Sequence, residues 1–162
     1  MGDFLLGPYE LPPRLTGAGY LNFLQNQLDQ LLMDALDDVP LAVRRRTWFM
    51  HDGAPPHFSV DVRQWLHRRF PYQWVGRGPD APVPWPARSP DLNPVDFYLW
   101  GHMKELVYAT PVETRDGLWQ RVQKAADAVR NGPGVFERVR ASTHRRAIAC
   151  IRSGGKHFEH LL

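Results

Sequence analysis

Two aspartates stand where carboxylates could do chemistry. Asp52 lies just past Thr47–Met50, a short apolar run that is followed by a turn signal at Asp52-Gly53 and therefore predicts a buried strand. Asp96 follows Asn93, a good helix N-cap, which places it at the third helical position. Ligands collect at the carboxyl ends of strands in α/β sheets. Two carboxylates that meet there repel each other unless a divalent cation lies between them, and Mg²⁺ prefers oxygen ligands.

Each aspartate also has a simpler structural explanation. Asp96 would be stabilised by the helix dipole and free N–H groups of a first turn, and Asp52 could serve only a turn. The occurrence of both aspartates at one predicted edge favours a catalytic role over these structural roles. Carboxylates that meet there could bind divalent cations, and a pair of metal ions can hold the attacking and leaving oxygens of a phosphodiester. A zinc site is disfavoured, since the spacing of His51, His57 and His102 fits no standard pattern.

The hydrophobic pattern predicts an α/β fold with a few-stranded sheet, flanking helices and a helical C-terminal region. Strands are expected near residues 3–11, 47–51 and 72–75. Apolar residues at three- and four-residue steps predict helices that begin near residues 17, 59, 94, 114 and 134. Residues 76–94 are rich in Gly and Pro and predict a long functional loop, with Trp85 as an exposed contact candidate. Trp48, Trp65 and Trp74 are expected in the core.

Length and composition fit a single domain over residues 1–162. The chain has 162 residues and 43% hydrophobic content, contains one cysteine, and has no apolar run long enough to predict a membrane span. Its net charge is +3, with two basic stretches: residues 44–80 hold seven Arg against three Asp, and residues 134–162 hold six basic residues against two Glu. These stretches fit contact with a polyanion, although charge alone favours the simpler explanation that they are solvated helix faces. The candidate residues for contact with such a polyanion are Arg44, Arg45, Arg46, Arg138, Arg140, Arg145 and Arg146.

Three segments resemble a known family. "HDGAPPH", "RSPDLNPVDFYLWGHMK" and "GGKHFEHLL" are similar to the catalytic region of Tc/mariner-type DDE/D transposases, over essentially the whole chain. The resemblance implies a ribonuclease H-like fold and Mg²⁺- or Mn²⁺-dependent cleavage and strand transfer on DNA, hence a nuclear location. It implies Asp52 and Asp96 as the catalytic and metal-binding acids, rather than Asp91. His57 and Asn93 are expected to position them.

The chain departs from the family pattern at its start. The first catalytic aspartate, the first two strands and the DNA-reading N-terminal region have no counterpart after Met1, so the fold is expected to be incomplete. Metal binding is therefore expected to be weak, and the chain to be a remnant or fragment that is inactive alone. Its expected partners are DNA and either a second copy or the missing N-terminal part of the same element. The alternatives are a non-enzymatic nucleic-acid-binding or host-retained interaction module, and one piece of a longer reading frame.

Overall fold

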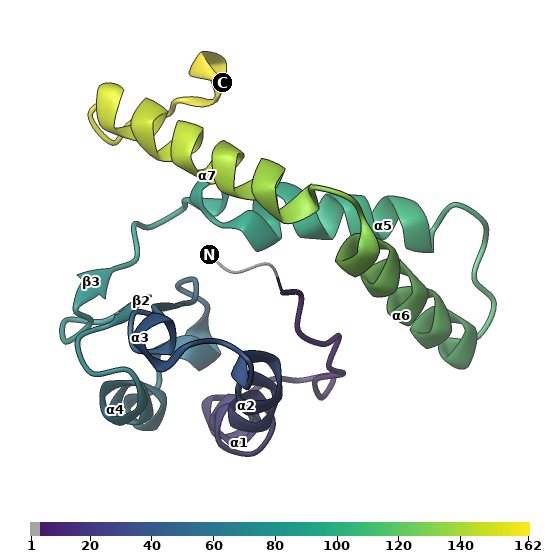
Figure 1. Cartoon of the computed structure of the whole chain (residues 1–162), viewed down its shortest axis with the longest axis horizontal. Coiled ribbons are helices and arrows are strands. Elements are labelled where there is room, and N and C mark those ends of the chain that lie inside the picture. The colour runs from purple at the N-terminus through teal and green to yellow at the C-terminus, as the bar shows by residue number, and fades with distance from the viewer. Residues whose placement is uncertain (1–3) are drawn as a thin grey trace. The chain divides into compact units, whose positions relative to one another are not determined.

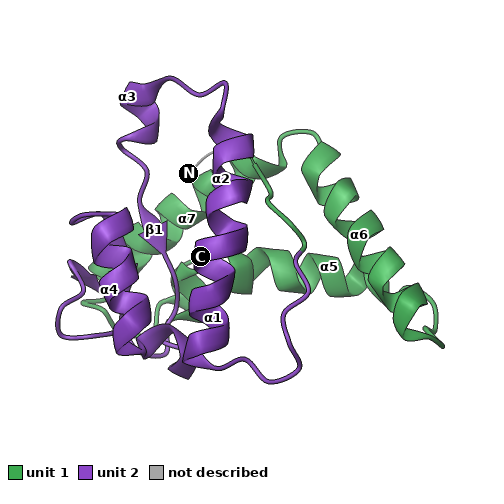
Figure 2. Ribbon diagram, turned by 90° about the horizontal axis from the view of Figure 1, so that it is seen from below, with its two compact units in different colours: residues 1–8, 89–162 green, residues 9–88 purple. Residues whose placement is uncertain are grey.

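The computed structural model describes residues 4–162, which form two compact units (Figures 1 and 2). One unit contains residues 9–88, and the other contains residues 89–162 together with the described part of the N-terminal segment, residues 4–8. No helix among the described residues is both long and apolar enough to cross a membrane. The expectation of a single domain over 1–162 stays a prediction, and each unit is described by itself.

The unit of residues 9–88 begins with a long helix. Helix α1 (Gly17–Phe23) continues through a π-helical turn (Leu24–Leu28) into α2 (Asp29–Leu36). The hydroxyl of Thr16 accepts a hydrogen bond from the N–H of Gly19 at 3.1 Å and so caps the helix. Tyr20 and Leu24, four residues apart, are both buried, as the predicted apolar stripe requires.

A three-stranded parallel sheet in order β1-β2-β3 forms the other part of this unit. After the short helix α3 (Leu41–Arg44), strand β1 (Phe49–Met50) pairs with β2 (Trp74–Gly76), and β2 pairs with β3 (Val83–Pro84). Helix α4 (Val60–Arg69), capped by Ser59, connects β1 to β2. The core is a cluster of seven buried side chains: Tyr20, Leu24, Val62, Trp65, Leu66, Phe70 and Trp74.

The second unit is helical. Its first elements are a 3-10 turn (Pro90–Leu92) and a π-helical turn (Val95–Leu99) that runs into α5 (Trp100–Val107). Helices α6 (Arg115–Asn131) and α7 (Val135–Arg152) follow, and a 3-10 turn (Glu159–Leu161) lies near the end. The core of this unit contains Met103, Val107, Ala125, Ala126, Val129, Val135 and Val139.

The turns between these helices explain where the helices begin. Thr114 accepts from the N–H of Gly117 at 3.1 Å and caps α6. Gly134 has a φ of +65° at the tight turn into α7, a backbone conformation that favours glycine. The predicted starts near residues 17, 59, 94, 114 and 134 are therefore confirmed to within one residue.

The predicted strand at residues 3–11 is wrong for the described residues. Residues 4–11 have no strand, and residue 3 lies outside the described part. Pro8 has no N–H to donate to a sheet. The carbonyls of Leu5 and Gly7 instead accept from the Arg130 guanidinium at 3.2 and 2.6 Å. The segment is thus attached to α6 by a side chain rather than to another strand.

The predicted strands at 47–51 and 72–75 are confirmed, as β1 and β2. The predicted loop at 76–94 is wrong in part, because it contains β3, and the N–H of Trp85 extends that ladder to the carbonyl of Gly76 at 2.8 Å. Trp65 and Trp74 are buried as expected. Trp48 is 51% exposed, contrary to expectation.

Candidate catalytic site

Asp52 lies in a turn that its own side chain helps to form. Its Oδ1 accepts from the N–H of Ala54 at 3.0 Å. A 3-10 turn (Pro55–Phe58) then brings His57 back, so that His57 Nδ1 lies 2.8 Å from Asp52 Oδ1 and 3.3 Å from the Asp52 carbonyl. The Asp52 side chain stays 41% exposed, against 18% for His57. The carboxylate is thus held in place and still open to solvent.

The rings of His51 and Tyr20 pack against the ring of His57 in this turn. The ring of His51 stacks on that of His57 with centroids 4.8 Å apart and planes 5° apart. The Tyr20 ring lies 4.3 Å from that of His57, and the Tyr20 hydroxyl lies 3.4 Å from Nδ1 of His51. These ring contacts limit the positions that His57, and through it Asp52, can adopt.

Burial determines the protonation states of His51 and Tyr20. It lowers the pKa of His51 to about 4, helped by the charge of His57 and opposed by that of Asp52, so His51 is neutral near pH 7. Burial, and then the negative charge of Asp52, raise the pKa of Tyr20, which therefore keeps its proton. The Asp52 carboxylate thus lies near two side chains, His51 and Tyr20, that are uncharged near pH 7.

Arg77 and Trp85 flank the same turn and were not assigned to it from the sequence. A Cβ at Gly53 would lie 3.5 Å from Cδ of Arg77 and 3.7 Å from Cδ1 of Trp85. The Arg77 guanidinium donates to the Gly53 carbonyl at 3.3 Å and lies 4.8 Å from the ring centroid of Phe58. The pairing of β3 with β2 brings Trp85 here, a contact that local sequence patterns do not reveal.

Asp96 lies in the first turn of its helix, as the capping pattern predicts. The carbonyl of Asn93 accepts from the N–H groups of Asp96 and Phe97, each at 3.0 Å, and its side-chain oxygen accepts from Val95 at 3.2 Å. The Asn93 amide also donates to Oδ2 of Asp96 at 2.8 Å. Asn93 therefore both caps the helix and orients the Asp96 carboxylate.

The two halves of the predicted site belong to different units. Asp52 and His57 lie together in the unit of residues 9–88, and Asp96 and Asn93 lie together in the other. A shared site for Asp52 and Asp96 stays a prediction. Within residues 4–162, the structure shows no group of three or more His, Cys, Asp or Glu arranged to hold a metal ion.

The carboxylates themselves suit a hard cation. The contacts of the Asp52 carboxylate with Ala54 and His57 involve Oδ1, and the contact of the Asp96 carboxylate with Asn93 involves Oδ2. Each side chain is partly exposed, and these contacts do not engage its second oxygen. Mg²⁺ takes oxygen ligands and is commonly held by one or two carboxylates plus water and phosphate. Asp52 and Asp96 therefore fit such an ion as monodentate ligands.

The candidate DNA-binding arginines differ in what they contact. The Arg44 guanidinium donates to the carbonyl of Val39 at 2.6 Å and to that of Asp37, so it stabilises the turn before α3. Arg138 donates to the Pro133 carbonyl at 2.9 Å. Arg45, Arg46 and Arg145 are exposed, and Arg140 and Arg146 are partly buried.

Sequence comparison relates the chain to transposases. It is 25% identical to the Tc1 transposase of Caenorhabditis elegans over 146 residues, which is 86% of this chain and 49% of that protein. It is 27% identical to the Tcb2 transposase of Caenorhabditis briggsae over 113 residues, 70% of this chain and 37% of that protein. No protein-family model matches. The chain spans about half the length of the first relative and less of the second.

Structural comparison agrees. The crystal structure of the catalytic domain of Mos1 mariner transposase superposes with a TM-score of 0.68 and 25% identity, over 90% of this chain and 65% of that one. The chain is related to the catalytic domains of Tc1/mariner transposases. Its mixed α/β architecture matches the ribonuclease H-like fold of the Mos1 catalytic domain, which confirms the fold expected from the sequence.

Proposed function

We propose that this Tc1/mariner-type chain acts on DNA through a divalent metal held by Asp52 and Asp96. The observation that carries the proposal is the geometry of the two carboxylates, each oriented by a dedicated neighbour and each with an oxygen to spare. The fold supports it, because the related Mos1 catalytic domain has been solved with Mg and with Mn, and Mos1 with a transposon end.

Within such a site, the residues of this chain would bind and orient. Mg²⁺ or Mn²⁺, when bound, would activate water and stabilise charge on a phosphodiester. Asp52 and Asp96 would supply one oxygen each. His57 and Asn93 would hold those oxygens in a productive geometry, and Arg77 beside Gly53 would place a positive charge where a DNA strand approaches Asp52.

A polypeptide of these 162 residues is proposed to cleave DNA weakly or not at all. The resemblance supplies three acids, and Asp52 and Asp96 match the second and third of them. Two carboxylates give a site with fewer anionic ligands for Mg²⁺, so affinity should fall. DNA as substrate makes the nucleus the proposed location, and a second copy or the first part of the same element are the proposed protein partners.

The second candidate function is a non-enzymatic nucleic-acid-binding or host-retained interaction module. The basic stretches and the exposed arginines favour it. In this case the two aspartates would no longer serve chemistry. The two functions differ in one respect: only the first makes DNA binding depend on metal through Asp52 and Asp96.

The test compares the unchanged chain with Asp52→Asn and Asp96→Asn for binding of a DNA duplex, with Mn²⁺ or with chelator, and for nicking of supercoiled plasmid. The proposal expects Mn²⁺ to strengthen binding in the unchanged chain only, with little nicking. Robust nicking would refute the proposed inactivity. Salt-dependent binding that neither Mn²⁺ nor the two substitutions alter would favour the interaction module.

A further inference from the structure

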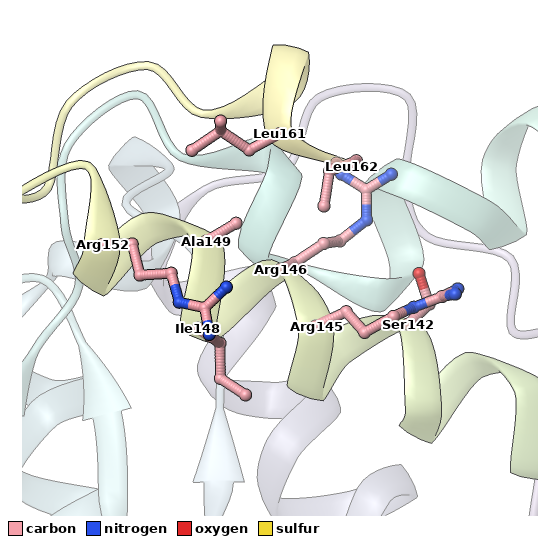
Figure 3. A pocket seen from close by; sticks show the side chains of 8 residues that line it. All are labelled: Ser142, Arg145, Arg146, Ile148, Ala149, Arg152, Leu161 and Leu162. Atoms are coloured by element: carbon pink, nitrogen blue, oxygen red, sulfur yellow. The ribbon is translucent and has the colours of Figure 1, made fainter.

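A cavity of about 540 Å³ lies between α7 and the C-terminal segment (Figure 3). Arg145, Arg146 and Arg152 project from α7 around it, together with the hydroxyl of Ser142. Apolar side chains complete the wall: Ile148, Ala149, Leu161 and Leu162. The cavity therefore combines three arginine side chains with an apolar surface, and its lining residues include no Asp or Glu, while Leu162 is the last residue of the 162-residue chain.

The spacing of these residues on α7 explains why they converge. Ser142, Arg145, Ala149 and Arg152 recur at steps of three and four, so they lie along one side of the helix. Arginine stays charged at any physiological pH, and like charges gathered at one cavity repel unless an anion joins them. Arg152, in the last turn, is also favoured by the helix dipole. This effect does not account for Arg145 or Arg146.

Arg146 is already held in place. Its guanidinium lies 4.3 Å from the ring centroid of Phe97, and its Nη1 lies 3.5 Å from the carbonyl of Asp91. Its Nε is buried and has no hydrogen-bond partner among the described residues. A guanidinium fixed in this way loses little conformational freedom when it binds a ligand. Its unused donor capacity points to an acceptor that the described chain does not supply.

We propose that this cavity is a contact site for a DNA strand, in which the arginines bind a phosphodiester and the apolar wall receives the sugar. The planar guanidinium fork matches the geometry of phosphate oxygens. Backbone contacts of this kind carry no sequence preference. The site goes beyond the proposed function, because neither Asp52 nor Asp96 lines the cavity and binding there needs no metal.

The test is the binding of the 162-residue chain to a DNA duplex of arbitrary sequence in chelator, measured over a range of salt concentrations. The pocket variant is Arg145→Gln with Arg152→Gln. The control is Arg68→Gln with Lys124→Gln, two exposed residues that do not line the cavity and whose substitution changes the net charge equally. Because chelator removes metal chemistry, failure here leaves the assignment of Asp52 and Asp96 untouched.

The pocket variant is expected to bind about tenfold more weakly at 0.1 M salt and to lower the slope of log K against log salt by about two, while the control keeps its slope. An equal loss in both variants, or no loss in the pocket variant, would overturn the proposal. So would tighter binding of a polyglutamate peptide than of DNA of the same charge. Ser142→Glu offers a second route, because a carboxylate at the cavity should also weaken DNA binding, and retained binding in that folded variant would contradict the site.

Discussion

The imidazole Nδ1 of His57 lies 2.8 Å from Oδ1 of Asp52, in a turn that begins where β1 ends. This contact ties the carboxylate to the 3-10 turn of Pro55–Phe58 and to the ring of His51 beneath it. It engages one oxygen of Asp52 and leaves the other for a ligand. The segment "HDGAPPH" therefore contains both the carboxylate, Asp52, and the residue that orients it, His57.

His57→Ala should weaken metal binding. Partners that orient a ligating side chain typically contribute about 10–100-fold to metal affinity, so the loss of Mn²⁺ affinity should fall in that range. Isothermal titration with Mn²⁺ measures it. His102→Ala, which removes a half-exposed histidine near Glu105, is the control and should change little. An unchanged Mn²⁺ affinity in His57→Ala would show that the contact has no role in the site.

Asn93→Ala should destabilise the second unit and also disturb Asp96. Loss of the cap should cost about 1 kcal/mol of unfolding free energy, measured by urea denaturation. The matched control is Thr114→Ala, which removes the cap of α6 and should cost a similar amount. Asn93→Ala, unlike Thr114→Ala, should also lower Mn²⁺ affinity, because the Asn93 amide donates to the Asp96 carboxylate. Equal Mn²⁺ affinity in the two variants would argue against this orienting role.

Gly76→Ala should destabilise the unit of residues 9–88. A Cβ at Gly76 would lie 2.3 Å from Nε2 of His51 and 2.7 Å from the Trp74 ring, so the core must shift, at about 1–3 kcal/mol. Gly101→Ala is the opposite case, because nothing lies within 4 Å of its Cβ and the residue is in helix α5. It should stabilise by roughly 0.5–1 kcal/mol. A melting temperature raised by Gly76→Ala would contradict the packing described.

His51 should make stability fall with acid. Its pKa of about 4 in the fold lies below the ordinary value of 6.5, so the folded state binds fewer protons than the unfolded state. This contribution is complete above pH 6.5 and is lost as pH falls towards 4. Between pH 7 and pH 5 it should remove about 2 kcal/mol. Denaturation of the unchanged chain and of His51→Asn in chelator should show a shallower pH dependence in the variant, and equal slopes would contradict the burial of an uncharged His51.

What the sequence reveals about this molecule is mostly local. The Asn93 cap and the position of Asp96 follow from steric and hydrogen-bonding preferences within four residues, and the structure has both. The strand at residues 3–11 was wrong because alternating apolar residues suggested it, while Pro8 and the Arg130 guanidinium determine what the backbone does. Strand β3, and with it Trp85 beside Gly53, depends on pairing between distant segments in a Gly- and Pro-rich stretch.

The contacts of the individual arginines could not be predicted from the sequence either. Charge patterning identified Arg145 and Arg146 as candidates, but only packing shows that Arg146 lies on the Phe97 ring beside Asp96. Patterning likewise gave no sign that Arg44 binds the carbonyls before α3. Residues of one type in one basic stretch thus have different contacts, and only the fold separates them.

The central claim is that Asp52 and Asp96 bind one metal site together, and paramagnetic relaxation by Mn²⁺ tests it most directly. In the unchanged chain, substoichiometric Mn²⁺ should broaden the amide signals of Gly53 and Phe97 at the same Mn²⁺ concentrations. Asp52→Asn should relieve the broadening at Phe97, and Asp96→Asn should relieve it at Gly53. Broadening at Gly53 that persists unchanged in Asp96→Asn would show that the two carboxylates do not share an ion.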